Sequence, residues 1–192
     1  MKNVTDNLVI NNDDLNIKSM KKLKNPVSYG KDIAADFKVQ SPGTFLYENN
    51  KYEIKSDIIG DHFKANMLGA IILALLNGIE IKDSLNAIES FAGVKRRIEL
   101  IGISKGVLIY DDYGHHPTEM EATITALKQQ TKSKLYVVFQ PHRYTRTMEY
   151  FSSFKDSLKL ADFAIVTDIY PAGESPIPVS YTHLTLPTTS TV

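Results

Sequence analysis

Three short segments of this chain concentrate side chains that can bind charges or transfer protons. They are residues 111–117 (DDYGHHP), 140–147 (QPHRYTRT) and 168–174 (DIYPAGE). Each segment directly follows an apolar stretch with the composition of a buried β-strand. In a sheet of parallel strands, ligands bind outside the carboxyl ends of the strands, where the loops lead into helices. The three segments therefore predict one site at one end of one sheet.

Two arginines in the second segment are the strongest candidates for binding an anion. Arg143 and Arg146 lie three residues apart just before a predicted helix, and His142 adds a further donor. Guanidinium groups bind carboxylate or phosphate through paired hydrogen bonds, and a helix amino terminus favours the same charge. The alternative is a surface salt bridge, which is common. We favour an anion site, and the same two interpretations apply to Arg96 and Arg97 at the junction of the two regions described below.

The first segment offers carboxylates and imidazoles. Asp111 and Asp112 are neighbours, so on a strand their side chains point to opposite faces and only one of them can meet a given ligand. His115 and His116 precede Pro117, a favoured first helical residue, so the helix dipole attracts an anion beside them. Neighbouring histidines rarely bind one zinc ion, and the chain has no cysteine. We therefore predict no metal site here.

Hydrophobic patterning predicts the elements that carry these segments. Before residue 93 it predicts a strand at 8–10, a helix at 17–23, a hairpin of strands 43–48 and 52–58 that turns at Asn49-Asn50, a nearly all-buried helix at 62–76 that ends at Asn77-Gly78, and a helix at 82–91. After residue 93 it predicts strands at 98–103 and 107–110, a helix at 117–129, a strand at 135–139, a helix at 148–160 and a strand at 163–167. Apolar strands that alternate with amphipathic helices predict an α/β unit whose parallel sheet is covered on both faces.

The change of pattern near Gly93 predicts two compact regions, and the composition limits their function. The 192 residues hold 22 basic and 22 acidic side chains, so no net charge attracts nucleic acid or an anionic membrane. The absence of cysteine excludes a disulfide scaffold and a cysteine nucleophile. The longest apolar run, residues 67–76, is about half of the ~20 residues that span a bilayer. We expect a cytoplasmic protein without a targeting segment, a nucleic-acid partner or a membrane partner.

The sequence contains neither a common phosphate-binding motif nor a nucleophile elbow. The Gly30-Lys31 pair is followed by Asp32 and does not complete a GxxxxGK[ST] loop, and GxGxxG does not occur. The string at 102–106 (GISKG) has the letters of GxSxG, but it joins two predicted strands and not a strand to a helix, so it is not a nucleophile elbow. The residues alone therefore indicate an anion-binding α/β protein.

Longer strings around the three segments resemble a known family. Residues 111–119 (DDYGHHPTE), 139–147 (FQPHRYTRT) and 168–177 (DIYPAGESPI) closely resemble the Mur ligases, and they occur in the same order. Residues 60–66 (GDHFKAN) are similar to the start of a helix in that family, and residues 91–99 (FAGVKRRIE) to its interdomain strip. The match extends from about Leu8 to Pro178.

The resemblance implies an enzyme of three domains: one for a UDP-sugar, a central ATP-binding domain, and a Rossmann-like carboxyl-terminal domain for an amino acid. On this basis residues 1–95 are the last part of a truncated central domain, residues 96–178 are a truncated carboxyl-terminal domain with a parallel sheet, and residues 179–192 are a non-native tail. The expectation is an internal fragment without the phosphate loop and most of the magnesium ligands.

The implied activity is ATP-dependent ligation of L-alanine to UDP-N-acetylmuramate through an acyl phosphate, a step of peptidoglycan precursor synthesis. Its cofactors are ATP and Mg²⁺, and the fragment itself is expected to be inactive. The implied residues are His115 and Arg97 for catalysis, His62, Asn66, Arg97 and Asp112 for the nucleotide, and Tyr113, His115, His142, Arg143 and Arg146 for the substrate. Phe63 stands where the family usually has Asn, which removes a polar group from the adenine side.

Two other functions remain open at this stage. One is the related recycling ligase that joins a tripeptide to the same sugar, although the Tyr113-Gly114 pair and the string at 140–147 favour the alanine enzyme. The other is a non-catalytic module that binds a nucleotide or another anion. The sequence does not define an oligomeric state.

Overall fold

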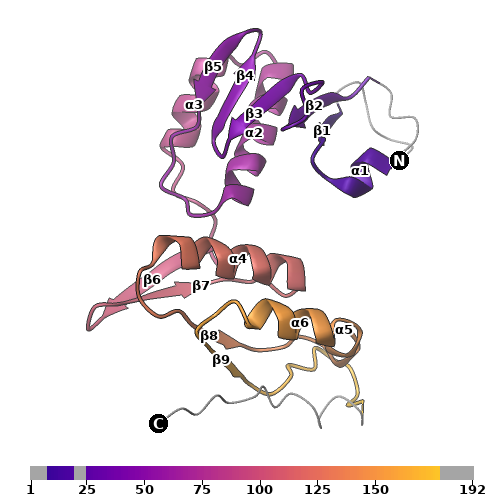
Figure 1. The fold of residues 1–192 in the computed structure, drawn as a ribbon, viewed down its shortest axis with the longest axis vertical. Helices are drawn as coiled ribbons and strands as arrows, with labels where there is room; N and C mark the ends of the chain where they lie inside the picture. The colour runs from indigo at the N-terminus through magenta and orange to yellow at the C-terminus, as the bar shows by residue number, and fades with distance from the viewer. Residues whose placement is uncertain (1–7, 20–24, 178–192) are drawn as a thin grey trace. The chain divides into compact units, whose positions relative to one another are not determined.

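The computed structural model describes residues 8–19 and 25–177, and the chain divides into two compact units between Gly93 and Val94 (Figure 1). The sequence changes its pattern at the same place. Both units combine helices with strands, so the α/β fold class predicted from the sequence is confirmed.

The amino-terminal unit contains one mixed sheet of five strands in the order β1-β2-β3-β4-β5. The strands are β1 (Val9–Asn11), β2 (Val27–Gly30), β3 (Phe37–Ser41), β4 (Thr44–Tyr47) and β5 (Asn50–Glu53). The first three are parallel, and the last three are antiparallel. Sequence patterning missed β2 and β3, because each has only four or five residues and its alternation of apolar and polar side chains contains just two apolar positions.

The predicted hairpin is present as β4 and β5, but its turn lies one residue earlier than expected. Tyr47 pairs with Asn50 across the hairpin. The two residues between them, Glu48 and Asn49, have φ values of 49° and 64°. Positive φ at both central positions gives the twist that a two-residue hairpin needs. The turn is therefore Glu48-Asn49 and not Asn49-Asn50.

Three helices complete this unit: α1 (Leu15–Ser19), α2 (Asp61–Leu76) and α3 (Ile81–Glu89). The helix predicted at 17–23 begins earlier, at Leu15, and residues 20–24 lie outside the described part of the chain. The predicted end of α2 is confirmed, because Gly78 has φ 81° and its N–H donates to the Leu75 carbonyl (2.9 Å). Within residues 8–19 and 25–177, no helix has the length and apolar character to cross a membrane.

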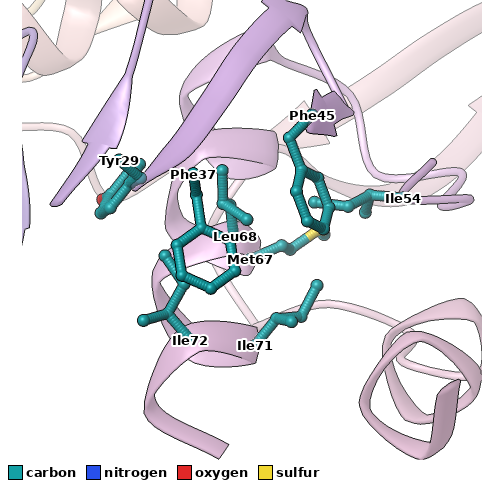
Figure 2. Close-up of a cluster of buried hydrophobic side chains, with 8 residues drawn as sticks. All are labelled: Tyr29, Phe37, Phe45, Ile54, Met67, Leu68, Ile71 and Ile72. Atoms are coloured by element: carbon teal, nitrogen blue, oxygen red, sulfur yellow. The ribbon is translucent and has the colours of Figure 1, made fainter. Parts of the chain in front are cut away.

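The core of the amino-terminal unit lies between α2 and the sheet (Figure 2). Its buried side chains are Tyr29, Phe37, Phe45, Ile54, Met67, Leu68, Ile71 and Ile72. The four that come from α2 recur at helical spacing and form one stripe. The expectation that this helix is nearly all buried is wrong, since Asn66, Ala70 and Leu73 form an exposed face.

The carboxyl-terminal unit is built from two short pairs of strands and three helices. In chain order they are β6 (Glu99–Ser104), β7 (Val107–Asp111), α4 (Pro117–Gln130), β8 (Tyr136–Phe139), α5 (Tyr144–Glu149), α6 (Phe151–Leu158) and β9 (Phe163–Val166). The single helix predicted at 148–160 is wrong. Tyr150, with φ −106° and ψ 19°, leaves the helical conformation and separates α5 from α6.

The predicted single parallel sheet is only partly correct. β8 and β9 are parallel, but β6 and β7 form an antiparallel pair, and the described residues contain no hydrogen-bonded pairing between β7 and β8. The reason is the connection, because Lys105-Gly106 joins β6 to β7 directly, whereas parallel strands need a long crossover.

Coverage of both faces of the β8–β9 pair is also not observed in the described residues. Side chains alternate along each strand, so Val137, Phe139, Ala164 and Val166 contact the cluster formed with α4 and α6. The intervening side chains are exposed by 43–68%; they are Tyr136, Val138, Phe163 and Ile165. One face of this strand pair is therefore packed against helices and the other is open.

A pair of substitutions on α2 tests the core of the amino-terminal unit. Ile72 is completely buried, whereas its neighbour Leu73 is 46% exposed. Removing a buried Ile side chain leaves a cavity and costs about 2–5 kcal/mol. We expect Ile72→Ala to reduce the free energy of opening of this unit by that amount, measured by native-state hydrogen exchange. Leu73→Ala is the control, and equal effects of the two substitutions would contradict the described packing.

Candidate functional site

The loops that follow β7, β8 and β9 meet in the carboxyl-terminal unit. β8 and β9 are parallel, so residues 140–147 and 168–174 leave the sheet at the same end. The His142 ring lies 6.3 Å from the His115 ring and 5.4 Å from the Tyr170 ring, measured between centroids. The three polar segments singled out in the sequence therefore contribute to one neighbourhood.

Main-chain hydrogen bonds fasten the second loop to the third. The N–H of Arg143 donates to the Tyr170 carbonyl, and the N–H of Tyr170 donates to the Pro141 carbonyl, each at 2.8 Å. The His142 ring stacks on the Tyr170 ring at an interplanar angle of 29°. These contacts continue the pairing of β8 with β9 beyond the strands, so the loops keep a defined geometry.

Arg143 occupies a strained position immediately before α5. Its φ is 73°, in the left-handed region that non-glycine residues rarely adopt, and its side chain makes no capping hydrogen bond. The Arg143 carbonyl accepts from both the N–H (3.1 Å) and the hydroxyl (2.6 Å) of Thr147. Such strain persists only where surrounding contacts hold it, and it recurs at functional sites. The guanidinium is free of a structural role in the helix cap.

A carboxylate from the third loop supplies the cap that Arg143 does not provide. Glu174 accepts from the N–H of Thr145 (3.0 Å) and from its hydroxyl (2.7 Å). These two hydrogen bonds, in that order, lower the pKa of Glu174, and the N–H of Tyr144 and the charge of Arg143 lower it further. Glu174 belongs to the third polar segment of the sequence, but its partnership with Thr145 was not predicted, because only the fold brings it to α5.

His142 lies in an environment that favours its neutral form. Burial lowers the pKa of His142, and the positive charges of Arg146 and Arg143 lower it further. Its Nδ1 atom is buried and has no hydrogen-bond partner among the described residues. Near neutral pH the ring is therefore uncharged and can exchange a hydrogen bond with a ligand without adding positive charge.

The first loop is organised around the start of α4. His116 is the N-cap residue, and its Nδ1 accepts from the N–H of Thr118 (3.3 Å). Glu119 closes the capping box by accepting from the N–H groups of His115 (3.0 Å) and His116 (3.2 Å). The sequence signature of a capping box is Ser, Thr, Asp or Asn followed three positions later by Glu or Gln, so the histidine at this N-cap gave no signal for Glu119.

Glu119 also contacts two of the residues predicted to belong to the site. Its Oε1 lies 3.5 Å from Nη1 of Arg97, and its Oε2 lies 3.8 Å from Nδ1 of His115. Burial raises the pKa of Glu119, but the N–H groups of His115 and His116 and the nearby positive charges outweigh burial, so the pKa is lowered. The carboxylate therefore stays ionised beside Arg97.

The two aspartates at the end of β7 have distinct partners. Asp111 pairs with Nε of Arg96 (3.1 Å), whose guanidinium lies 4.6 Å above the Tyr113 ring. Asp112 accepts from the N–H of Ile98 through Oδ2 (2.9 Å) and from the N–H of Gly114 through Oδ1 (2.7 Å). Asp112 therefore organises the backbone around the site, whereas Asp111 holds the Arg96 side chain.

The remaining predicted residues, His62 and Asn66, belong to the amino-terminal unit. They lie one turn apart near the start of α2, where His62 contacts the Phe63 ring at 4.2 Å between centroids. His62 also lines a cavity of about 240 Å³ together with Asp13, Tyr29 and Lys31. Among the described residues, no group of three or more His, Cys, Asp or Glu side chains is arranged to hold a metal ion.

Comparison with known proteins identifies the family of this chain. Residues 96–181 match the family model described as Mur ligase, glutamate ligase domain. The UDP-N-acetylmuramate–L-alanine ligase of Dictyoglomus turgidum is 40% identical over 182 residues, which are 88% of this chain and 39% of that protein. The chain therefore belongs to the Mur ligase family, and it spans well under half of the length of that relative.

Solved structures agree with this assignment. The UDP-N-acetylmuramate–alanine ligase of Thermotoga maritima is 27% identical with a TM-score of 0.63, and the match covers 75% of this chain and 34% of that one. A murein peptide ligase from Psychrobacter arcticus is 28% identical with a TM-score of 0.51, and the match covers 69% and 30%.

The contact between Glu174 and Thr145 gives a pH-dependent prediction. A lowered pKa means that this carboxylate stabilises the folded state above pH 4.5, its ordinary pKa, and that the contribution is lost as the pH falls below that value. Thr145→Val removes the hydroxyl donor and keeps the N–H. We expect the Glu174 titration midpoint, followed by carbon-13 NMR, to rise toward 4.5 in this variant. An unchanged midpoint would mean that the hydroxyl does not hold Glu174.

Proposed function

We propose that this chain is part of an ATP-dependent ligase that joins L-alanine to UDP-N-acetylmuramate through an acyl phosphate, in cytoplasmic synthesis of cell-wall precursors. The observation that carries the proposal is the convergence of His115, His142 and Tyr170 from three loops at one end of the carboxyl-terminal unit. The similarity to ligases of that name supports the choice of substrates.

The described residues supply part of what binding of ATP requires. Bound ATP with Mg²⁺ would supply the phosphoryl group that activates the carboxylate of the sugar. Arg97, with a side chain that is 37% exposed, is available to neutralise a phosphate. The described residues contain neither a phosphate loop nor a cluster of magnesium ligands, so the proposal assigns this chain no role in holding the metal.

The proposed role of the two arginines is to orient the amino acid. Arg143 and Arg146 would bind the carboxylate of L-alanine, which directs its amine toward the acyl centre. The neutral His142 ring lies beside them and adds a hydrogen bond without extra charge. Holding the two reactants in one geometry supplies much of the acceleration of such a reaction.

The proposed role of His115 is to accept a proton from the attacking amine. Its Nδ1 lies 3.1 Å from the Tyr113 carbonyl oxygen. A carbonyl oxygen can only accept a hydrogen bond, so Nδ1 carries the proton in this contact, and Nε2 of the neutral ring is left as an acceptor. The Tyr113 ring packs against the imidazole at 5.3 Å and limits its rotation.

Two alternatives have specific tests. The similarity to a murein peptide ligase favours a recycling enzyme that uses a tripeptide in place of L-alanine. A non-catalytic module would bind nucleotide or another anion without turnover. Dependence of the reaction on L-alanine, and not on a tripeptide, distinguishes the first from the proposal, and any turnover excludes the second.

The first functional prediction uses a graft. Residues 94–177 replace the matching segment of the Thermotoga maritima ligase, and phosphate release is followed with ATP, UDP-N-acetylmuramate and L-alanine. We expect alanine-dependent release, because the amino-acid site is carried by the grafted unit. Arg143→Ala or Arg146→Ala should weaken L-alanine use by about 2–5 kcal/mol, the cost of leaving a carboxylate unpaired.

Lys128→Ala is the control for the graft, since Lys128 pairs with Asp162 on the outside of the unit. It removes a positive charge from the same unit but should leave L-alanine use unchanged. Unaltered alanine kinetics in both arginine variants would reject the carboxylate clamp. Release that depends on a tripeptide alone would support the recycling ligase.

The second functional prediction concerns the 192-residue polypeptide on its own. Phosphoryl transfer depends on positioning and on neutralising the charge of the phosphates, and this sequence has no phosphate loop. We expect no alanine-dependent phosphate release and only weak nucleotide binding, with a Kd of about 1 mM. Release by the purified polypeptide that disappears in Arg97→Ala would overturn this prediction and reveal an unrecognised phosphate site.

A further inference from the structure

Glu119 contacts more of the site than any capping role requires. Its carboxylate accepts from the N–H groups of His115 and His116 and also lies 3.5 Å from the Arg97 guanidinium. A capping box is satisfied by the contacts to the start of the helix alone. The approach of Arg97, which comes from before β6, is an additional interaction.

The position of the Glu119 carboxylate is fixed independently of Arg97. Two backbone N–H groups fix Oε2 at 3.0 and 3.2 Å, so its position is set by the first turn of α4 and does not depend on the arginine. An ion pair between partly exposed side chains contributes little to stability. The Arg97–Glu119 contact, with side chains 37% and 35% exposed, is therefore better suited to orient Arg97 than to stabilise the fold.

The backbone on both sides of Arg97 is fixed as well. Arg96 and Ile98 have φ values of 58° and 50°, and the N–H of Ile98 donates to Asp112 at 2.9 Å. The Arg96 carbonyl accepts from the N–H of Tyr113 at 2.8 Å. The Arg96 side chain pairs with Asp111, whereas the Arg97 side chain pairs with Glu119. The two adjacent guanidinium groups are thus directed to different carboxylates.

We propose that Glu119 is a positioning residue that holds the Arg97 guanidinium and the His115 imidazole in one arrangement at the site. This inference rests on the proposed function, in which Arg97 meets a phosphate and His115 accepts a proton from the amine. The negative charge of Glu119 is required for Arg97, whereas an uncharged acceptor is enough for the cap. The two roles are therefore separable by substitution.

Glu119→Gln separates the capping of α4 from the holding of Arg97, because Gln at this position also closes a capping box but carries no charge. Glu119→Ala removes both the cap and the charge. Glu121→Gln is the matched control: it removes one negative charge from an exposed position on the same helix. All three variants, together with the wild type, are made in the 192-residue chain and in the grafted ligase.

In the 192-residue chain, the readout is the NMR signal of the Arg97 Nε–H group. Contact with a carboxylate restricts the guanidinium, so we expect a distinct signal in the wild type and in Glu121→Gln. The signal should shift to the position of a free arginine in both Glu119 variants. Thermal unfolding should change in Glu119→Ala but not in Glu119→Gln. An Arg97 signal that is the same in the wild type and in Glu119→Gln would overturn the proposal.

In the grafted ligase, the readout is turnover. Misplacing a reacting group by about 1 Å can cost up to about 100-fold, so we expect Glu119→Gln to lower kcat by about tenfold or more without lowering the thermal midpoint. Glu121→Gln should keep the wild-type kcat. A wild-type kcat in Glu119→Gln would reject the positioning role. A wild-type graft without alanine-dependent release would reject the proposed function, and the Arg97 signal would then decide the role of Glu119 independently.

Discussion

The site of the carboxyl-terminal unit depends on how the unpaired N–H groups at two helix starts are satisfied. The first N–H groups of any helix lack partners within the helix. At α4 the acceptors are the His116 ring, which accepts from the N–H of Thr118, and Glu119, which accepts from the N–H of His116. At α5 the acceptor is Glu174 from a loop 29 residues further along the chain. The His115 imidazole and the Arg143 guanidinium, which lie beside these helix starts, accept no capping hydrogen bond.

The same arrangement explains why strained residues are tolerated. Arg143, Arg96 and Ile98 all have left-handed backbone conformations, and each lies beside a carboxylate or carbonyl that fixes its neighbours. A flexible loop would relax such strain, but the pairing of residues 141–143 with Tyr170 prevents relaxation. The local cost is offset by the packing of β8 and β9 against α4 and α6.

Sequence reasoning located the three polar loops correctly, because apolar strands and the residues that follow them are local signals. It missed β2 and β3, whose alternating pattern is only four or five residues long, and it joined α5 to α6 across Tyr150. It also merged β6 and β7 into a parallel sheet, although a two-residue turn connects them. The partners of Glu174 and the second role of Glu119 could not be predicted, since they depend on contacts that only the folded chain creates.

The open face of the β8–β9 pair has a consequence for colloidal behaviour. Tyr136, Val138, Phe163 and Ile165 present an apolar stripe to water, and the polypeptide has no net charge at pH 7, with an isoelectric point of about 7.0. Near pH 7 the molecules therefore repel one another least, and nothing opposes the attraction between their apolar stripes. Solubility should therefore pass through a minimum near neutrality and increase on either side of it.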